Sequence, residues 1–581
     1  MGAPQIDAVE GMALRVLIID GYTDEPAGLG VPPYIDVYPR YMAGAVWKHD
    51  PSAEVLYKTI DEVRQDPNGV AAISSSSDLS VLVAGVTVPG KYLGGAPATA
   101  RDAVSLPRIL SSKHTAICGP AVRFGFGRGG GSTTEIPREL RSLYEFLISG
   151  DPETVLYDLL SDGFHARADI DAVRPNENSI NDFAARGAKI IEQHPCYPAG
   201  LICEVETFRG CPRSLCGGCS FCTEPLHGTP DFRSVSGIAK EIAALHSAGA
   251  LNFRLGRQPD LLIYGTKDQN ETPVPNPGAV RRLFKSVRKA APALKVLHID
   301  NINPATILNH PDAAEEALKA IVEYHTPGDV AAMGVESADP EVIRKNNLKI
   351  YPDGVIFAIS MVNGIGSERG ENGMPHLLPG INFVYGLPGE TKRTYEANLE
   401  LMKNVLEMGL MVRRINMRQV MVMPSTRMSS FGDHLARKHR QLFLRHKAAM
   451  RSQVDEPMLK RVLPTWTVLR GLRTELAEGR ITWARQLGSY PVLVGIQKTM
   501  APGLVTDVVV VSHGPRSVGA LPVPIKVNNM SLRELEAIPG IGSRRAATLI
   551  RHRPYRNADE IRAGLDDPSL LDAIIQLIEF T

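Results

Sequence analysis

Cysteine is scarce in this sequence, with only seven residues in 581. Small secreted domains that depend on disulfides are far richer in cysteine, so the sequence excludes that class. Aromatic residues reach 6% and charged residues 22%, against 44% hydrophobic residues. This balance is ordinary for a globular chain and argues against extensive disorder. The length predicts several domains, because one domain usually spans about 100–200 residues.

An excess of either charge is also lacking, since 64 Lys and Arg stand against 63 Asp and Glu, a formal net charge of +1. The chain as a whole is therefore not a polycation that wraps nucleic acid, and any basic surface must be local. One such segment is 434–480, which has eleven basic and four acidic residues and helical periodicity.

Long hydrophobic runs are missing too. No stretch reaches the roughly 18 apolar residues that a membrane-spanning helix needs. The apolar run at 12–19 is too short for a secretory signal, and Asp7 and Glu10 precede it. We therefore expect a cytoplasmic protein with no membrane partner. Thiols stay reduced in that compartment, where clustered cysteines are typical of metal binding.

Apolar runs alternate with helical stretches from the beginning of the chain. A helix is predicted around 35–48, and the predicted strands are 14–19, 54–57, 79–86 and 115–118. Such alternation favours a parallel α/β sheet, which we place in a first domain at 1–150. A polar connector with its own helix follows at 151–199.

The same alternation resumes at 200 and predicts a parallel partial (β/α) barrel over 200–430. Its predicted strands are 201–206, 251–255, 295–299, 330–335, 380–385 and 415–422, and its helices include 235–248, 276–290, 311–323 and 392–408. Residues 431–527 are predicted to form a basic helical segment up to 480 and a small β-barrel-like region at 488–527. The last unit, 528–581, is predicted to be helical, with a tight turn at 538–542.

Four of the seven cysteines lie in one short segment, at Cys211, Cys216, Cys219 and Cys222. A structural zinc site usually has two cysteine pairs that come together across a fold, so four thiols on one loop are tightly spaced for zinc. An iron–sulfur cluster is larger, and consecutive thiolates of one loop can reach different iron corners. The Gly-Gly pair at 217–218 lets such a loop fold back. The spacing favours an iron–sulfur cluster, with zinc as the alternative.

Cys219-Ser-Phe221-Cys222 resembles the end of the cluster loop of the radical S-adenosylmethionine (SAM) superfamily, in which three cysteines bind a [4Fe–4S] cluster and an aromatic residue precedes the last one. Arg209-Gly-Cys211-Pro resembles the opening of that loop in the methylthiotransferase-like branch. The resemblance implies that Cys211, Cys219 and Cys222 hold the cluster. Cys216, three positions before Cys219, is the alternative to Cys211.

Two further motifs are similar to that branch and follow in the family's order. Met333–Ser337, with 341–349 after it, resembles a stretch whose polar side chains contact the methionine or ribose part of SAM, which implies roles for Glu336 and Ser337. Residues 383–391 resemble a turn whose backbone packs beside the adenine. The cofactor-binding residues implied by the whole resemblance are Phe221, Glu336, Ser337, Gly386, Pro388, Gly389 and Glu390. The stretch 253–258 departs from the family's Gly-Gly-Glu pattern, so no residue is assigned to the amino group of SAM.

The resemblance implies a chemistry as well as a site. The reduced cluster cleaves SAM to a 5′-deoxyadenosyl radical, and the protein supplies binding, orientation and exclusion of solvent. An electron donor such as ferredoxin or flavodoxin is implied as a partner. Asp300 and Asn301 follow a predicted strand, where barrel folds place active-site groups, and are the catalytic candidates. The alternative for this pair is a helix-capping turn.

The first domain resembles the Rossmann-like, cobalamin-binding-like domain that precedes the radical core in many relatives. The D-x-H-x-x-G signature is absent, and neither His49 nor His114 stands in its context. Because many relatives bind cobalamin without that histidine, the resemblance admits cobalamin as a further cofactor. The three N-terminal cysteines of methylthiotransferases are not reproduced.

Residues 535–547 resemble a helix–hairpin–helix motif, whose Gly-x-Gly turn exposes backbone N–H groups to phosphate oxygens. The resemblance implies nucleic-acid contacts from Gly540, Gly542, Arg544 and Arg545. We therefore expect a radical SAM enzyme that modifies a nucleic acid by methylthiolation or methylation, with tRNA favoured over DNA. One alternative is a cobalamin-linked enzyme acting on a small metabolite. The other is a nucleic-acid-binding scaffold with a structural cluster.

Overall fold

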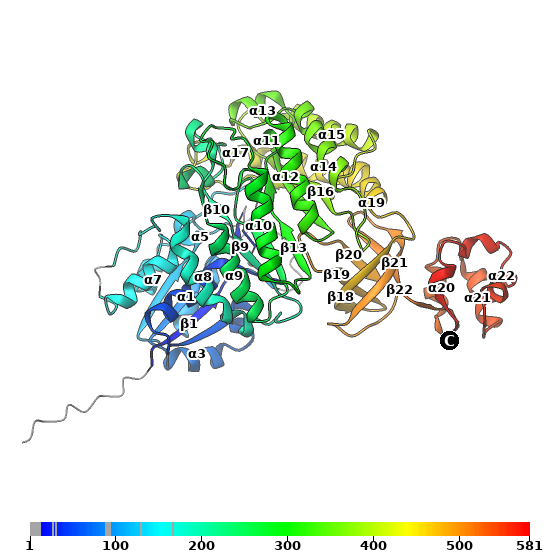
Figure 1. Ribbon diagram of the computed structural model, residues 1–581, viewed down its shortest axis with the longest axis horizontal. Coiled ribbons are helices and arrows are strands. Elements are labelled where there is room, and N and C mark those ends of the chain that lie inside the picture. The colour runs from blue at the N-terminus through cyan, green and yellow to red at the C-terminus, as the bar shows by residue number, and fades with distance from the viewer. Residues whose placement is uncertain are drawn as a thin grey trace, which may run out of the picture.

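The computed structural model describes residues 13–25, 28–29, 32–86, 95–127, 130–165 and 168–580. Figure 1 shows the N-terminal sheet, in blue, beside a larger central unit in green and yellow. A small barrel in orange lies on the other side of that unit, and a helical C-terminal unit in red stands beyond the barrel.

The N-terminal domain is a parallel five-stranded sheet in the order β5-β1-β6-β7-β8, which makes it a doubly wound α/β fold. Both faces are covered, so its strands are continuous apolar runs. The strands are β1 (Arg15–Asp20), β5 (Glu54–Thr59), β6 (Leu79–Val83), β7 (His114–Cys118) and β8 (Phe146–Leu147). The helices are α1 (Val37–His49), α2 (Ile60–Gln65), α3 (Pro67–Ser75), α4 (Ala100–Ser105), α5 (Pro120–Phe124), α6 (Leu140–Leu143) and α7 (Pro152–Ser161). A two-stranded ribbon, β2 (Asp24–Glu25) with β3 (Gly28–Leu29), follows β1.

The connector packs directly on α1. It contains α8 (Asn181–Arg186) between two short 3₁₀ helices. A Cβ atom at Gly44 would lie 1.8 Å from the carbonyl oxygen of Phe183, and one at Gly187 would lie 1.7 Å from that of Arg40. The two backbones are therefore in contact, which only glycine permits at these positions.

The central unit contains the six predicted parallel strands, so the partial (β/α) barrel is confirmed. Its two sheets have the orders β13-β12-β9-β4 and β14-β15-β16-β17, and they join where β13 and β14 are separated only by Asp300. The last predicted strand ends at Gln419 rather than 422. The strands are β9 (Ile202–Glu206), β12 (Asn252–Gly256), β13 (Val296–Ile299), β14 (Asn301–Ile302), β15 (Asp329–Glu336), β16 (Leu377–Tyr385) and β17 (Arg414–Gln419). The helices are α9 (Val235–Ser247), α10 (Pro277–Ala290), α11 (Pro304–Asn309), α12 (Pro311–Tyr324), α13 (Pro340–Lys345), α14 (Pro352–Gly366) and α15 (Lys392–Glu407).

The N-terminal region adds one strand to the edge of this barrel. β4 (Tyr34–Ile35) pairs in parallel with β9, with Tyr34 opposite Ile202 and Ile35 opposite Cys203. The first domain and the core are thus joined by main-chain hydrogen bonds as well as by side chains.

The basic segment is helical only in its first part. The helices α16 (Met428–Phe431), α17 (His434–Lys438), α18 (Arg440–Met450) and α19 (Glu456–Val462) end at residue 462. The prediction of helix up to 480 is wrong, because Val468–Glu478 forms β18. Register shifts between Leu469 and Leu472 and between Thr474 and Leu476 break the two-residue alternation that would have indicated a strand.

The β-barrel-like region is a closed barrel, larger than predicted, in the order β18-β19-β20-β22-β21. Its further strands are β19 (Ile481–Gln486), β20 (Leu493–Ile496), β21 (Val505–His513) and β22 (Ser517–Val523). The end of the predicted region, 525–527, lies outside the barrel, where β23 (Ile525–Lys526) pairs with β24 (Ile578–Glu579).

The C-terminal unit contains α20 (Leu532–Glu536), α21 (Ser543–Arg551) and α22 (Ala558–Ala563). Its core is continuous with barrel residues, since Val509 and Leu521 pack in the same cluster as Leu535 and Leu549. Among the described residues, no helix is long and apolar enough to span a membrane.

Candidate active site

The cysteine loop follows β9 at the carboxyl edge of the core. A short strand, β10 (Phe208–Arg209), pairs with β11 (Asp231–Phe232) and brackets the loop. Gly217 and Gly218 have φ angles of +78° and +64°, so the chain reverses there as the sequence predicts.

Three thiols of the loop form one partly buried group. Burial raises the pKa of Cys211 to about 12 and also raises the pKa values of Cys219 and Cys222. The neighbouring thiols add to the rise for Cys222, since ionised Cys219 and Cys211 would repel its charge. A group of thiolates at this place needs a bound cation, which an iron–sulfur cluster supplies.

Cys216 stands apart from this group. It is exposed, and its Sγ donates to the Glu271 carboxylate at 3.0 Å. Asn347 Nδ2 lies 3.4 Å from the same sulfur. The arrangement favours Cys211 over Cys216 as the first cluster ligand. Within the described parts of the chain, no three His, Cys, Asp or Glu side chains surround a single point closely enough to hold one metal ion.

The loop is fixed by the segment that follows β15. The Ser220 hydroxyl donates to Asn346 Oδ1 at 2.6 Å, and Asn347 Nδ2 donates to the Gly218 carbonyl at 2.9 Å. From the other side, Arg427 Nη2 donates to the same carbonyl at 2.7 Å. The predicted motif at 341–349 therefore positions the cysteines through its two asparagines.

A pocket of 340 Å³ opens beside the loop and brings four predicted site residues together. They are Phe221, Cys222, Asn301 and Glu336. Polar side chains of the last two core strands complete the wall: Asn382, Arg414, Asn416 and Arg418. Met421, Met423 and Phe443 supply an apolar side. We call this space the reaction pocket.

Glu336 occupies a strained position at the end of β15. Its φ angle is +68°, a region that few non-glycine residues adopt and that is enriched at functional sites. Burial raises the pKa of Glu336 to about 7, although Lys349 and Arg418 oppose the rise. The carboxyl is thus poised between its two protonation states near neutral pH. Ser337, by contrast, is buried and accepts the Asp339 N–H at 3.1 Å.

The turn at 386–390 is held from within by Glu390. This buried carboxylate accepts the Gly386 N–H at 2.5 Å, the Tyr395 hydroxyl at 2.8 Å and His439 Nδ1 at 2.8 Å. Gly386 and Gly389 have φ angles of +88° and +91°, which the turn requires. These three contacts occupy the Glu390 carboxylate and direct it toward the turn itself. Pro388 uses its carbonyl to accept Asn346 Nδ2 at 2.8 Å.

Asp300 and Asn301 lie at the junction of the two core sheets and have different surroundings. Asp300 is fully buried in an ion pair with Arg254, which in turn contacts Glu204 at 2.7 Å. Burial raises the pKa of Asp300 to about 6, and Arg254 opposes this rise. Asn301 lines the reaction pocket. Of the two catalytic candidates, only Asn301 is placed to touch a substrate.

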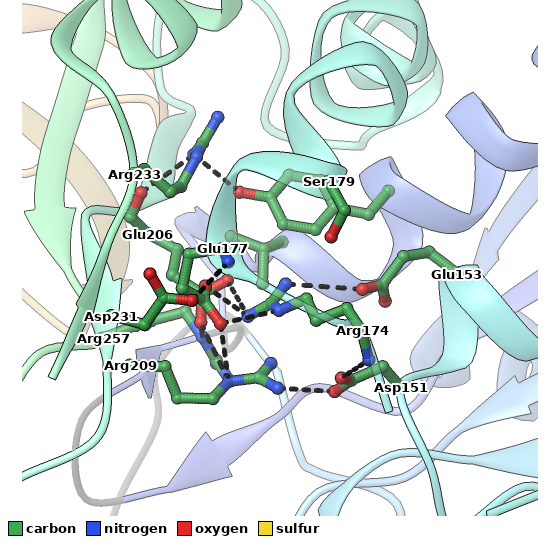
Figure 2. Close-up of polar contacts among 12 residues, drawn as sticks. Asp151, Glu153, Arg174, Glu177, Ser179, Glu206, Arg209, Asp231, Arg233 and Arg257 are labelled. Atoms are coloured by element: carbon green, nitrogen blue, oxygen red, sulfur yellow. Dashed lines mark hydrogen bonds and ion pairs between the residues drawn. The ribbon is translucent and has the colours of Figure 1, made fainter. Parts of the chain in front are cut away.

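A buried ionic network lies directly behind the cysteine loop, and Figure 2 shows it. Arg174 of the connector contacts Glu177 at 2.8 Å and Glu206, the last residue of β9, at 2.7 Å. Arg209, two residues before Cys211, donates to Asp151 at 2.6 Å. The network therefore ties the loop to the connector and to the N-terminal domain. Arg257, in the stretch that departs from the family pattern, contacts Asp36 at 3.1 Å.

The N-terminal domain also reaches the reaction pocket itself. Val86, just beyond the carboxyl end of β6, and Gly130 line it. The carboxyl edge of the N-terminal sheet thus faces the carboxyl edge of the core.

The sequence of the core has a matching family. Residues 205–412 match the model of the Radical SAM superfamily. An uncharacterised protein of Methanocaldococcus jannaschii is 44% identical over 513 residues, 87% of this chain and 92% of that protein. An uncharacterised protein of Archaeoglobus fulgidus is 42% identical over 528 residues, which cover 91% and 93% of the two chains.

The chain belongs to the radical SAM superfamily. It is a radical SAM enzyme, and the superfamily assigns it a [4Fe–4S] cluster and SAM. The thiols of Cys211, Cys219 and Cys222 fit the cluster, because they lie on one loop where burial outweighs the opposing effect of Lys349 on Cys211 and Cys219, so that their thiolates call for further positive charge. The closer resemblance to the methylthiotransferase-like branch stays a prediction.

The chain also has low similarity to solved structures of radical SAM enzymes. The radical SAM methyltransferase TsrM from Kitasatospora setae, with cobalamin and a [4Fe–4S] cluster bound, has a TM-score of 0.47 and 13% identity, covering 72% of this chain and 77% of that one. The cobalamin-dependent radical SAM enzyme OxsB has a TM-score of 0.44 and 13% identity, covering 75% and 56%. No residue role is transferred from either.

Several pocket residues of the radical SAM core were not predicted from the sequence. Arg414, Asn416 and Arg418 alternate along β17 with the buried Ile415 and Met417. That two-residue period, with polar side chains toward the barrel interior, is the signal that could have found them. Tyr490 comes from the small barrel and has no such local signal.

The predicted nucleic-acid residues lie far along the chain, in the C-terminal unit. Gly540 has a φ of +85° in the turn between α20 and α21. Gly542 is the N-cap of α21 and has open space beside its Cα. Arg544 is exposed, whereas Arg545 forms an ion pair with Asp566 at 2.6 Å. The naming of this turn as a helix–hairpin–helix stays a prediction.

Proposed function

We propose that this radical SAM enzyme is of transferase type and holds cobalamin as a second cofactor against the reaction pocket. The observation that supports this most is the shared wall of that pocket. Val86 and Gly130 of the N-terminal domain line it together with Phe221 and Cys222 of the cluster loop.

The strand order supports a ligand at that edge. In the N-terminal sheet β1 has β5 on one side and β6 on the other, so the order reverses between β1 and β6. In open parallel sheets, ligands bind outside the carboxyl ends of the strands at such a reversal. Val86 follows β6 at this point, and the reaction pocket begins there.

The positions of the histidines in the N-terminal domain limit how cobalamin would be held. His49 ends α1 and His114 begins β7, so both lie at the amino edge of the sheet, away from the pocket. Residues 13–150 contain no other histidine. We therefore propose that cobalamin binds here without a histidine of this domain on its cobalt.

The chain's own residues would orient the reactants. Asn382 Oδ1 accepts Asn416 Nδ2 at 3.1 Å, which fixes both amides at the pocket wall. Glu336 offers a carboxylate beside the cluster loop for a cationic amino group. The apolar side of the pocket would protect a carbon radical from water.

Anaerobic expression with hydroxocobalamin tests the proposal. We expect the purified protein to retain about one cobalamin per chain, read from its absorbance. The Val86→Trp variant fills the edge of the pocket and should lose cobalamin while it retains iron. Val173→Trp, at a position 60% exposed, is the matched control. A wild-type protein that carries the cluster and no cobalamin would overturn the proposal.

A second candidate is modification of a nucleic acid, with tRNA favoured and DNA as the alternative. The specific observation is the open turn at Gly542 with Arg544 exposed beside it. Backbone N–H groups at the beginning of α21 would bind phosphate oxygens without reading sequence. Comparative nucleoside mass spectrometry of RNA from cells with and without the protein tests this. A nucleoside that disappears with the gene supports it, and identical profiles argue for the small-molecule reading.

The electron donor and the compartment also belong to the proposal. Reduction of the cluster calls for a low-potential carrier such as ferredoxin or flavodoxin, in the reducing cytoplasm. Pull-down of a reduced ferredoxin in an anaerobic extract, with activity restored by it in place of dithionite, is the test.

A further inference from the structure

A second and larger cavity, of 740 Å³, lies at the open side of the partial barrel. Tyr34 of β4 is on one margin, and the first and last strands of the core leave this gap between them. β17 forms the other margin. The loop 486–492 of the small barrel closes the bottom, where the Tyr34 hydroxyl donates to the Gly488 carbonyl at 2.9 Å.

The walls of this cavity are strongly basic. Seven cationic side chains face two carboxylates, Asp455 and Glu475. Among the residues that the structure describes, Arg485 alone of the seven has an ion-pair partner, Glu475 at 2.8 Å. The other six are Arg413, Arg414, Arg418, Lys447, Arg451 and Arg516.

Contacts with Tyr490 fix two of the six cations, and Arg451 and Arg516 both act on the Asp455 carboxyl without forming an ion pair with it. Arg413 Nη2 donates to the Tyr490 carbonyl at 2.7 Å, and the guanidinium of Arg414 lies 3.7 Å from the centre of the Tyr490 ring. The buried Nε atoms of Arg413 and Arg451 have no hydrogen-bond partner in the described chain. Burial lowers the pKa of Arg413 to about 10, and Arg414 and Arg516 lower it further. Arg516 is exposed, but the other five cations are partly buried, where unpaired charge is costly and an anionic ligand would offset that cost.

The basic cavity adjoins the reaction pocket. The two share six lining residues, Arg414, Asn416, Met417, Arg418, Lys447 and Tyr490. A ligand in the cavity would therefore lie next to the space beside the cluster loop. A volume of 740 Å³ lies within the range of about 300–1,000 Å³ that small-molecule sites occupy.

We propose that the basic cavity binds the anionic part of the substrate, a small molecule with at least two phosphate or carboxylate groups, whose reacting end passes Tyr490 into the reaction pocket. Guanidinium groups bind such groups in a fixed, two-pronged geometry. The proposal rests on the proposed function only for the use of the reaction pocket. Binding of the anion itself does not depend on it.

Isothermal titration calorimetry on the reconstituted full-length protein tests this, with inorganic pyrophosphate and citrate as separate probes at low salt. We expect saturable binding of at least one probe at about one per chain. Comparison of the two affinities shows whether the cavity prefers phosphate or carboxylate groups. Arg451→Gln and Arg516→Gln should each weaken it at least tenfold. Arg440→Gln is the matched control, because Arg440 is exposed on α18 and lines neither cavity.

Two results would overturn the inference. One is the failure of both probes to bind. The other is an equal loss in the Arg440→Gln control, which would indicate a general charge effect. If neither probe binds and bulk tRNA binding is lost in Arg451→Gln and Arg516→Gln, the cavity serves a polymer instead and the small-anion proposal is wrong. Formation of 5′-deoxyadenosine and retention of cobalamin, measured on the same wild-type sample, judge the proposed function separately.

Discussion

Arg209 Nη1 donates a hydrogen bond of 2.6 Å to Asp151 Oδ1, and this contact joins the cluster loop to the beginning of α7, where the N-terminal domain passes into the connector. Arg209 is two residues from Cys211, and Asp151 stands at the N-cap position of α7 without a capping hydrogen bond from its side chain. Burial raises the pKa of Asp151, but Arg209 and Arg174 more than offset this, so its pKa lies below the usual range. The carboxylate is therefore ionised at neutral pH and holds both arginines.

Replacement of Asp151 by Asn should loosen this connection. Removing one partner of a buried ion pair leaves an uncompensated charge, and we expect a loss of about 3 kcal/mol in the free energy of unfolding. Iron should also be lost faster on exposure to air, because the loop is less firmly held. Urea unfolding and timed iron assays measure the two effects. Glu396→Gln, which removes an exposed ion pair with Lys392, is the control and should change neither.

The choice between Cys211 and Cys216 can be made by substitution. We expect Cys211→Ser to lose the cluster, because its thiol belongs to the buried group with Cys219 and Cys222. Cys216→Ser should retain the full iron content, since the Cys216 sulfur is exposed and donates a hydrogen bond to Glu271. Iron and sulfide analysis after anaerobic reconstitution gives the answer. A complete cluster in Cys211→Ser would show that the assignment is wrong.

Much of the fold could be predicted because its strands are buried on both faces. Runs such as 16–19 and 79–83 are wholly buried, so their apolar character is visible in the sequence. β18 was missed for the opposite reason. Its residues are half exposed, rich in Arg and Glu, and interrupted by two register shifts.

Site residues were predicted where they stand close together in the sequence, and they were missed where distant segments bring them together. Phe221 and Cys222 lie within one loop, so a motif reveals them. Arg451 and Arg516 meet at the same cavity from different elements. The charge excess of 434–480 gave no sign of this, because part of that charge is used elsewhere: Arg461 donates to the carbonyls of Leu406 and Leu410.

A buried carboxyl in the N-terminal sheet should make stability depend on pH. Burial raises the pKa of Asp20 to about 6, although hydrogen bonds from Tyr57 and Tyr22 oppose this. The unfolded state loses this proton near pH 3.8 and the folded state near 6. Stability from this group is therefore present below pH 3.8 and is lost as the pH rises through 6.

The Asp20→Asn variant has no ionisable group at this position. Its comparison with wild type therefore isolates the contribution of Asp20. Between about pH 4 and 7, wild type should lose roughly 2 kcal/mol relative to the variant. Urea unfolding of both proteins across this range, with the difference plotted against pH, is the measurement. A flat difference would mean that Asp20 titrates normally in the folded protein.

The two arginines after the Gly540 turn should behave differently if the protein binds tRNA. Arg544 is exposed, whereas Arg545 is held by Asp566 at 2.6 Å. We expect Arg544→Gln to weaken tRNA binding and to reduce the slope of log K against log salt by about one. Arg545→Gln should have a smaller effect. Equal binding by wild type and both variants would argue against a nucleic-acid role for this turn.

The most direct test of the account is the formation of 5′-deoxyadenosine. The protein is reconstituted anaerobically with iron and sulfide, mixed with SAM and dithionite, and analysed by mass spectrometry. The account predicts 5′-deoxyadenosine from wild type and from Cys216→Ser, and none from Cys211→Ser, Cys219→Ser or Cys222→Ser. A wild-type protein with a full [4Fe–4S] cluster that leaves SAM intact would contradict it.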